Sequence, residues 1–80
     1  MNYLEAIKDY GEDKLENDMN NVTMSENFRD ISFGVHSITE SLVKRYELDE
    51  ENAAVLDDYI FFKVIEKLAV KFAKGGEENE

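Results

Sequence analysis

The chain contains no proline, and glycine occurs at only four positions. These two residue types usually interrupt regular structure at turns and long loops. Their scarcity favours α-helices joined by short polar connections, so the predicted fold class is all-α. With 80 residues the chain forms one domain at most, and a domain this small buries roughly 60 % of its surface on folding. A core of this size is marginal alone, which favours a chain that works with a partner.

The clearest predicted helix spans about residues 50–74. Asp49 is a candidate N-cap followed by two acidic residues, and the pair Gly75-Gly76 is expected to end the helix. At about 100° per residue, the main apolar face carries Ala54, Phe61, Ile65, Leu68 and Phe72, widened by Phe62 and Ala69, while Lys63, Lys67, Lys71 and Lys74 lie opposite. The helix is therefore predicted to be amphipathic, with its lysines in solvent.

A second long helix is predicted over about residues 24–47. Thr23 to Glu26 match a capping box with Thr23 as the N-cap. The alternation of Ile31, Phe33 and Val35 would instead make residues 31–35 a short strand. Apolar residues recur at helical spacings of three and four over a longer stretch, at Phe28, Ile31, Val35, Ile38 and Leu42. Helix is therefore the preferred interpretation.

The amino-terminal segment is expected to form a short helix that contains Tyr3, Ile7 and Tyr10 and is interrupted at Gly11. Asn17 to Asn21 is interpreted as the connection to the next helix. The resulting architecture is a small three-helix domain over residues 1–74, with a short N-terminal helix and two longer antiparallel helices. Residues 75–80 are expected to be a flexible acidic tail.

Residues 59–65 are apolar almost all round the last helix. Ile60 and Val64 are predicted to point toward the lysine side, away from the main apolar face. Either the first helix covers this second side, or this second side lies in a subunit interface. Small size and heptad-like spacing favour a homo-oligomer, and twofold dimers are the commonest closed assembly. The predicted protein interface consists of Phe61, Phe62, Ile65, Leu68, Phe72, Ile60 and Val64.

Two further positions allow two interpretations each. Gly34 clusters with Ser37 and Ser41 on one side of the predicted middle helix. A glycine inside a helix costs about 1 kcal/mol relative to alanine, so either another backbone approaches closely there or the helix is locally weakened and faces solvent. Asp58 lies in the apolar face of the last helix. It is either at the edge of the core or a polar contact across an interface.

The chain carries 19 acidic and 9 basic residues, a net charge of -10. This argues against nucleic-acid binding, because a phosphate backbone needs a basic surface. Acidic residues concentrate in residues 5–18, 47–58 and 77–80, and the candidate acidic patch is Glu50, Glu51, Asp57 and Asp58. Dense carboxylates can imitate a nucleic-acid backbone. The alternative function is therefore an acidic inhibitor, of the kind found in phages and mobile elements, that blocks a basic nucleic-acid-binding host protein.

The sequence offers little for chemistry. The single histidine, His36, has Ser32 one turn away, but one short helix cannot build an oxyanion hole. Cysteine is absent, and no phosphate-binding or dinucleotide motif occurs. No apolar run approaches the ~18 residues of a membrane span, and no signal-like segment opens the chain. We therefore predict a non-enzymatic, cytoplasmic protein-binding or assembly protein without catalytic residues, metal or cofactor, which acts through helix–helix contacts and binds neither nucleic acid nor membrane.

Overall fold

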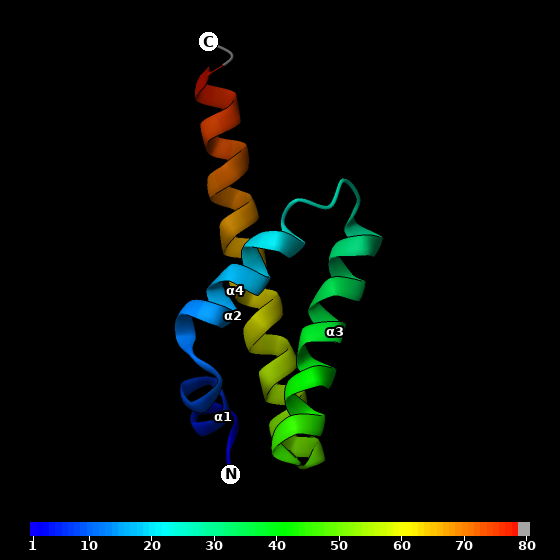
Figure 1. Ribbon diagram of the computed structural model, residues 1–80. Helices are drawn as coiled ribbons and strands as arrows, with labels where there is room; N and C mark the ends of the chain where they lie inside the picture. Colours follow the sequence, from blue (N-terminus) through cyan, green and yellow to red (C-terminus); the bar gives the residue numbers. More distant parts are fainter. Residues whose placement is uncertain (79–80) are drawn as a thin grey trace.

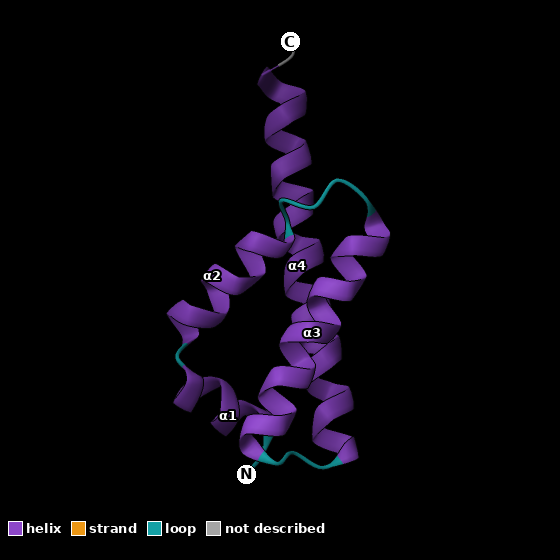
Figure 2. Cartoon of the chain, turned by 45° about the vertical axis from the view of Figure 1, so that its right-hand side comes forward, coloured by secondary structure: helices purple, strands orange, loops and turns teal. Residues whose placement is uncertain are grey.

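The computed structural model describes the backbone of residues 1–78 and the side chains of residues 1–73. Within residues 1–78, the chain forms four α-helices and no strand, which confirms the all-α class (Figure 2). The helices are α1 (Tyr3–Tyr10), α2 (Glu12–Val22), α3 (Phe28–Tyr46) and α4 (Glu50–Glu78). Residues 31–35 are helical, so the strand interpretation was wrong. The three-helix description also differs, because the amino-terminal segment forms two helices.

The break between α1 and α2 is at Gly11, as predicted. Gly11 has φ +107°, a backbone conformation that L side chains rarely adopt. The chain then resumes as α2, so Asn17 to Asn21 is helical and is not the predicted connection. Leu15 and Met19 are both buried. Their spacing of four places them on one side of α2, and this packing outweighs the low helix propensity of the asparagines.

The predicted cap of α3 was misplaced. Thr23 has helical backbone angles and ends α2, where its hydroxyl donates to the Asn20 carbonyl at 2.6 Å. The N-cap of α3 is Asn27, whose side-chain oxygen accepts from the backbone N–H of Asp30 at 2.9 Å. The capping-box interpretation failed because the last turn of α2 already uses Thr23. By contrast, Asp49 accepts from the backbone N–H of Asn52 at 2.8 Å, as expected of a cap for α4.

Helix α4 does not stop at residue 74. It continues across Gly75 and Gly76 as far as Glu78, the last residue that the structure describes. Glycine is a weak helix stop because it keeps its backbone N–H and adds no steric clash, so it costs only about 1 kcal/mol relative to alanine. Residues 79–80 of the predicted tail lie outside the described residues, and the flexibility of the tail stays a prediction.

Helices α3 and α4 form an antiparallel hairpin, and α1 and α2 cover one side of it (Figure 1). The start of α1 lies beside the start of α4, because the backbone N–H of Tyr3 donates to the Asn52 side chain at 3.0 Å. The Tyr3 and Tyr59 rings lie 6.2 Å apart in the same region. The carboxyl-terminal part of α4 extends beyond the other three helices (Figure 1).

The buried side of α4 is turned away from the predicted one. Leu56, Ile60, Val64 and Leu68 form the buried row, and Ile60 and Val64 have no exposed surface. The structure therefore supports the interpretation in which the chain itself covers this second side of α4, whereas the prediction that Phe61, Ile65 and Phe72 mark the main buried face was wrong. Lys63 and Lys67 are half-buried, with their carbon stems on the side of α1 and α2. Because these two stems are buried, the packed surface of α4 includes the lysine side. The opposite side of α4 faces solvent.

Gly34 lies where α2 ends against α3. A Cβ atom at this position would lie 2.8 Å from one methyl carbon of Val22 and 3.1 Å from the other. Between the two interpretations of this glycine, the structure supports close approach. The neighbour is a side chain of the same molecule. The absence of a Cβ atom at Gly34 therefore allows α2 to pack closely on the hairpin.

Candidate functional site

The two sides of the α3–α4 hairpin have different partners within the chain. Gly34 and Tyr59 face α2 and α1, whereas His36 and Phe61 lie about half a turn away on their helices and face away from them. We call the side opposite α1 and α2 the open face. On α4 its row consists of Ala54, Asp58, Phe61, Ile65 and Phe72, and the beginning of α3 adds Phe28.

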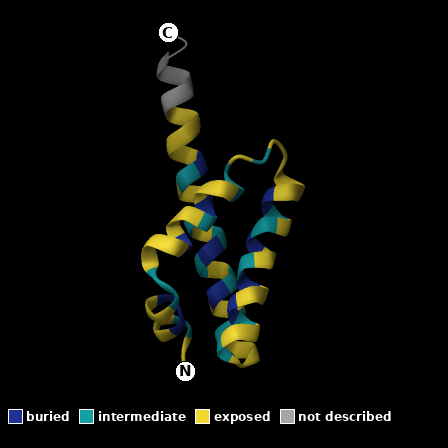
Figure 3. Cartoon of the chain, in the orientation of Figure 1, coloured by how far each residue is buried: buried dark blue, intermediate teal, exposed yellow. Residues whose placement is uncertain are grey.

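The open face carries large apolar side chains in solvent. The Phe28 and Phe61 rings pack edge to face, with centroids 5.8 Å apart, yet Phe28 is 60 % exposed. Ile65 is 37 % exposed and Phe72 is 72 % exposed. Figure 3 shows that exposed positions continue along the projecting part of α4. A contiguous group of exposed large apolar residues is typical of a binding surface.

A groove of about 520 Å³ lies at one end of the open face. It lies between the α2–α3 connection and the outer part of α4, and its apolar lining includes Met24, Phe28, Ile31, Leu68 and Phe72. Met24 is 74 % exposed. The groove therefore extends the apolar surface beyond α4 itself.

The predicted interface residues divide between core and surface. Ile60 and Val64 are fully buried within the chain, whereas Leu68 is buried except where it lines the groove. The other four are at least partly accessible: Phe61, Phe62, Ile65 and Phe72. The sequence also predicted contacts through the apolar spacing of the middle helix, and Phe28, its first member, is exposed at the start of α3, whereas Ile31, Val35 and Leu42 are buried. Met24 was missed as a surface residue.

The acidic patch is also divided. Glu50 and Glu51 are exposed in the first turn of α4, and Asp58 is exposed on the open face. Asp57 is half-buried, and one of its carboxylate oxygens accepts a 2.7 Å hydrogen bond from the hydroxyl of buried Thr39. The same oxygen lies 2.9 Å from Nδ1 of His36. Asp57 thus joins α3 to α4 and has a structural role.

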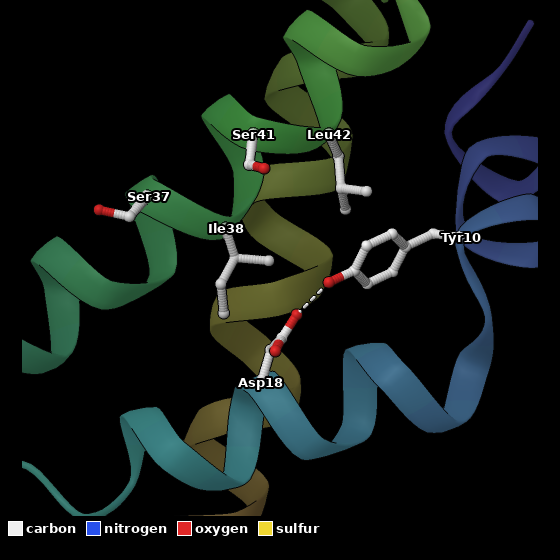
Figure 4. A pocket seen from close by; sticks show the side chains of 6 residues that line it. All are labelled: Tyr10, Asp18, Ser37, Ile38, Ser41 and Leu42. Atoms are coloured by element: carbon white, nitrogen blue, oxygen red, sulfur yellow. Dashed lines mark hydrogen bonds between the residues drawn. The ribbon is translucent and has the colours of Figure 1, made fainter.

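A small polar pocket of about 210 Å³ lies on the covered side of the hairpin (Figure 4). The Tyr10 hydroxyl donates to the Asp18 carboxylate at 2.5 Å, and the two side chains point toward one another across the pocket. Ile38 and Leu42 of α3 also line it. The hydrogen bond from Tyr10 to Asp18 and partial burial raise the pKa of the Tyr10 hydroxyl above its ordinary value near 10. This bond links the end of α1 to α2 across the bend at Gly11.

The Tyr10–Asp18 bond predicts a loss of stability at alkaline pH. The folded pKa of Tyr10 is raised, so its stabilising effect is complete below about pH 10, where the unfolded hydroxyl ionises, and falls as the pH rises through the folded pKa. Tyr10→Phe removes this part of the pH dependence. Thermal unfolding of both proteins between about pH 8 and about pH 11 measures it. Equal steepness in the two proteins would contradict the assignment. Tyr46, whose pKa is also raised by burial, contributes to the remaining slope.

The lysines of α4 are not a free basic stripe. Lys67 forms an ion pair with Glu16 of α2, and the ammonium of Lys71 donates to the carbonyl oxygen of Thr23 at 3.1 Å. Lys63 lies over the ring of Tyr59 and beside Glu66. The prediction that these lysines lie in solvent was therefore wrong for Lys63 and Lys67, which are half-buried, whereas Lys71 is exposed. Lys67 and Lys71 join α4 to α2 and to the residue that ends it.

Among the described residues, no group of three or more histidine, aspartate or glutamate side chains is placed to hold a metal ion. None of the described helices has both the length and the apolar character needed to span a bilayer. Comparison of the chain with protein-family models, curated proteins and solved structures gives no match. A functional proposal therefore depends on the geometry of the surface.

Proposed function

We propose that this chain is a non-enzymatic protein-binding and assembly protein, which acts through helix–helix contacts and associates with copies of itself. The observation that supports this proposal is the open face, where Phe28, Phe61, Ile65 and Phe72 form an apolar surface that no helix of the described chain covers. A chain of 80 residues has little core to spare. Leaving large apolar residues outside that core is favourable when a partner covers them.

The free energy from burial of the open face is comparable to the cost of association. Full burial of one large apolar side chain contributes about 1.5–3 kcal/mol, and less where part is already buried. Phe28, Ile65 and Phe72 still expose 60 %, 37 % and 72 % of their surface, and Phe61 is half-buried. Counted on both copies, their burial contributes about 6–12 kcal/mol, which lies within the range of the association cost of about 4–15 kcal/mol. The open face thus supports weak to moderate association.

Sedimentation analysis of matched aspartate variants tests self-association. We expect the wild-type chain to form an oligomer, and Ile65→Asp and Phe72→Asp to sediment as monomers that keep their helical circular dichroism. Leu4→Asp is the control, because Leu4 is 56 % exposed on α1, which lies on the side opposite the open face. Its oligomer should be unchanged. A wild-type chain that stays monomeric at high concentration, or equal effects of all three variants, would refute the proposal.

The second candidate function is an acidic inhibitor that blocks a basic, nucleic-acid-binding partner. The contact of Tyr3 with Asn52 favours it, because this contact brings the acidic amino-terminal segment to the acidic start of α4. The third acidic block begins at the opposite end of α4, so the three blocks form no single stripe (Figure 1). Under this function, a captured partner is released steeply by salt, and Glu50→Gln with Glu51→Gln weakens the capture. Capture that is insensitive to salt would argue against it.

A further inference from the structure

The open face is complementary to a second copy of itself in one orientation. We propose that two copies pair through their open faces around a twofold axis, with the two α4 helices antiparallel and crossing between Phe61 and Ile65. This inference depends on the proposed self-association and adds the identity and direction of the partner surface. It is argued from the row of residues on α4, from their sizes and from their charges.

The sizes along the row favour the antiparallel arrangement. Its members recur at helical spacing, so they lie along one side of α4. One midpoint, residue 63, relates Ala54 to Phe72 and also Phe61 to Ile65. In an antiparallel pair the small Ala54 therefore faces the large Phe72 of the other copy at both ends of the contact. A parallel pair would place phenylalanine against phenylalanine at one end and leave a gap between alanines at the other.

The charges favour the same arrangement. Residues 49–62 contain five acidic residues and no basic one, whereas residues 63–74 contain four lysines and Glu66. A parallel pair would place the two acidic halves side by side, with Asp58 against its own copy. In the antiparallel pair, ten residues of helix rise separate the two Asp58 side chains by about 15 Å. That distance exceeds the Debye length of about 8 Å at physiological salt, so the two Asp58 carboxylates scarcely repel each other.

The projecting part of α4 also gains a partner in this arrangement. Phe72 is 72 % exposed although it lines the groove beside the α2–α3 connection, so most of its surface is left for a partner. The antiparallel copy places the beginning of its α4, around Ala54, against this segment. Pairing thus covers the most exposed phenylalanine of the open face with the smallest residue of the row.

The absence of cysteine from the chain makes cross-linking a direct test. Ala54→Cys and Phe72→Cys are prepared separately, mixed and oxidised. We expect a disulfide-linked dimer in the mixture and none from either variant alone, and its loss when Ile65→Asp is added to both. Ala73→Cys replaces Phe72→Cys in a second mixture, so that the phenylalanine is kept. Leu4→Cys is the control, because Leu4 lies on α1 on the opposite side of the hairpin, and it should not cross-link with any of these variants.

The outcomes separate this inference from the proposed function. Cross-linking of Ala54→Cys with itself would show a parallel pair, which overturns the orientation while self-association stands. A chain that sediments as a dimer but forms no cross-link in either mixture uses another surface, and the inference is then wrong. A wild-type chain that sediments as a monomer overturns both proposals.

Discussion

Ile60→Ala is expected to destabilise the domain by about 2–5 kcal/mol, the usual cost of truncating a fully buried isoleucine. Ile65→Ala, on the same helix, is expected to cost about 1 kcal/mol or less because much of its side chain is already in water. The two residues have the same side chain, but Ile60 has no exposed surface and Ile65 is 37 % exposed. Urea unfolding followed by circular dichroism measures both, at a concentration low enough to keep the chain monomeric.

The comparison tests the orientation of α4 directly. The sequence placed Ile65 on the main packed face and Ile60 on the lysine side, but in the structure the lysine side is the packed one. Total stability at about 0.05–0.15 kcal/mol per residue is only about 4–12 kcal/mol for a chain of this length, so Ile60→Ala removes a large share of it. Equal costs for the two variants, or a larger cost for Ile65→Ala, would contradict the orientation described above.

The effect of Gly34→Ala on the free energy of unfolding is expected to change sign with the residue at position 22. In the wild-type chain the added Cβ would lie 2.8 Å from a methyl carbon of Val22. Overpacking of this kind costs about 1–3 kcal/mol, and the gain of about 1 kcal/mol in helix propensity only partly offsets it. Net destabilisation is therefore expected. In a Val22→Ala background only the Cβ of residue 22 remains, 3.4 Å away, and Gly34→Ala should then stabilise α3 by about 1 kcal/mol.

A double-mutant cycle of Gly34→Ala and Val22→Ala measures this coupling by chemical denaturation. Ser37→Ala is a suitable control, because Ser37 is an exposed position of α3 three residues further on. It should have the same small effect in both backgrounds. If Gly34→Ala also changes stability equally in both backgrounds, this glycine is not needed for the close approach of α2 to α3.

The presence of helices could be predicted from the sequence, but their limits could not. The lack of proline and the spacing of apolar residues in α3 and α4 are local signals, and both led to helix. The boundary near Thr23 failed because two capping sequences lie close together. Thr23 with Glu26 and Asn27 with Asp30 both place a capping side chain three residues before an acidic residue. Only the length of α2, which depends on Leu15 and Met19 packing on the hairpin, decides between them.

The surface was predictable only in part, for a related reason. Helix α4 carries apolar residues on two sides, and hydrophobicity alone favoured the side with the larger aromatic residues. The packed side is instead the one where Lys63 and Lys67 lay their stems toward α1 and α2. The bond of Asp57 to Thr39 joins residues 18 positions apart on different helices. No spacing rule within one helix could indicate it.

The contact between Tyr3 and Asn52 has a consequence for the order of folding. It joins residues 49 positions apart, whereas α3 and α4 are joined by a short turn and can pair as soon as both helices form. Closing a long loop costs more conformational entropy than closing a short one. We therefore expect the α3–α4 hairpin to form first as a template. The amino-terminal helices then dock on one side of it, and they are the first to detach when the chain begins to unfold.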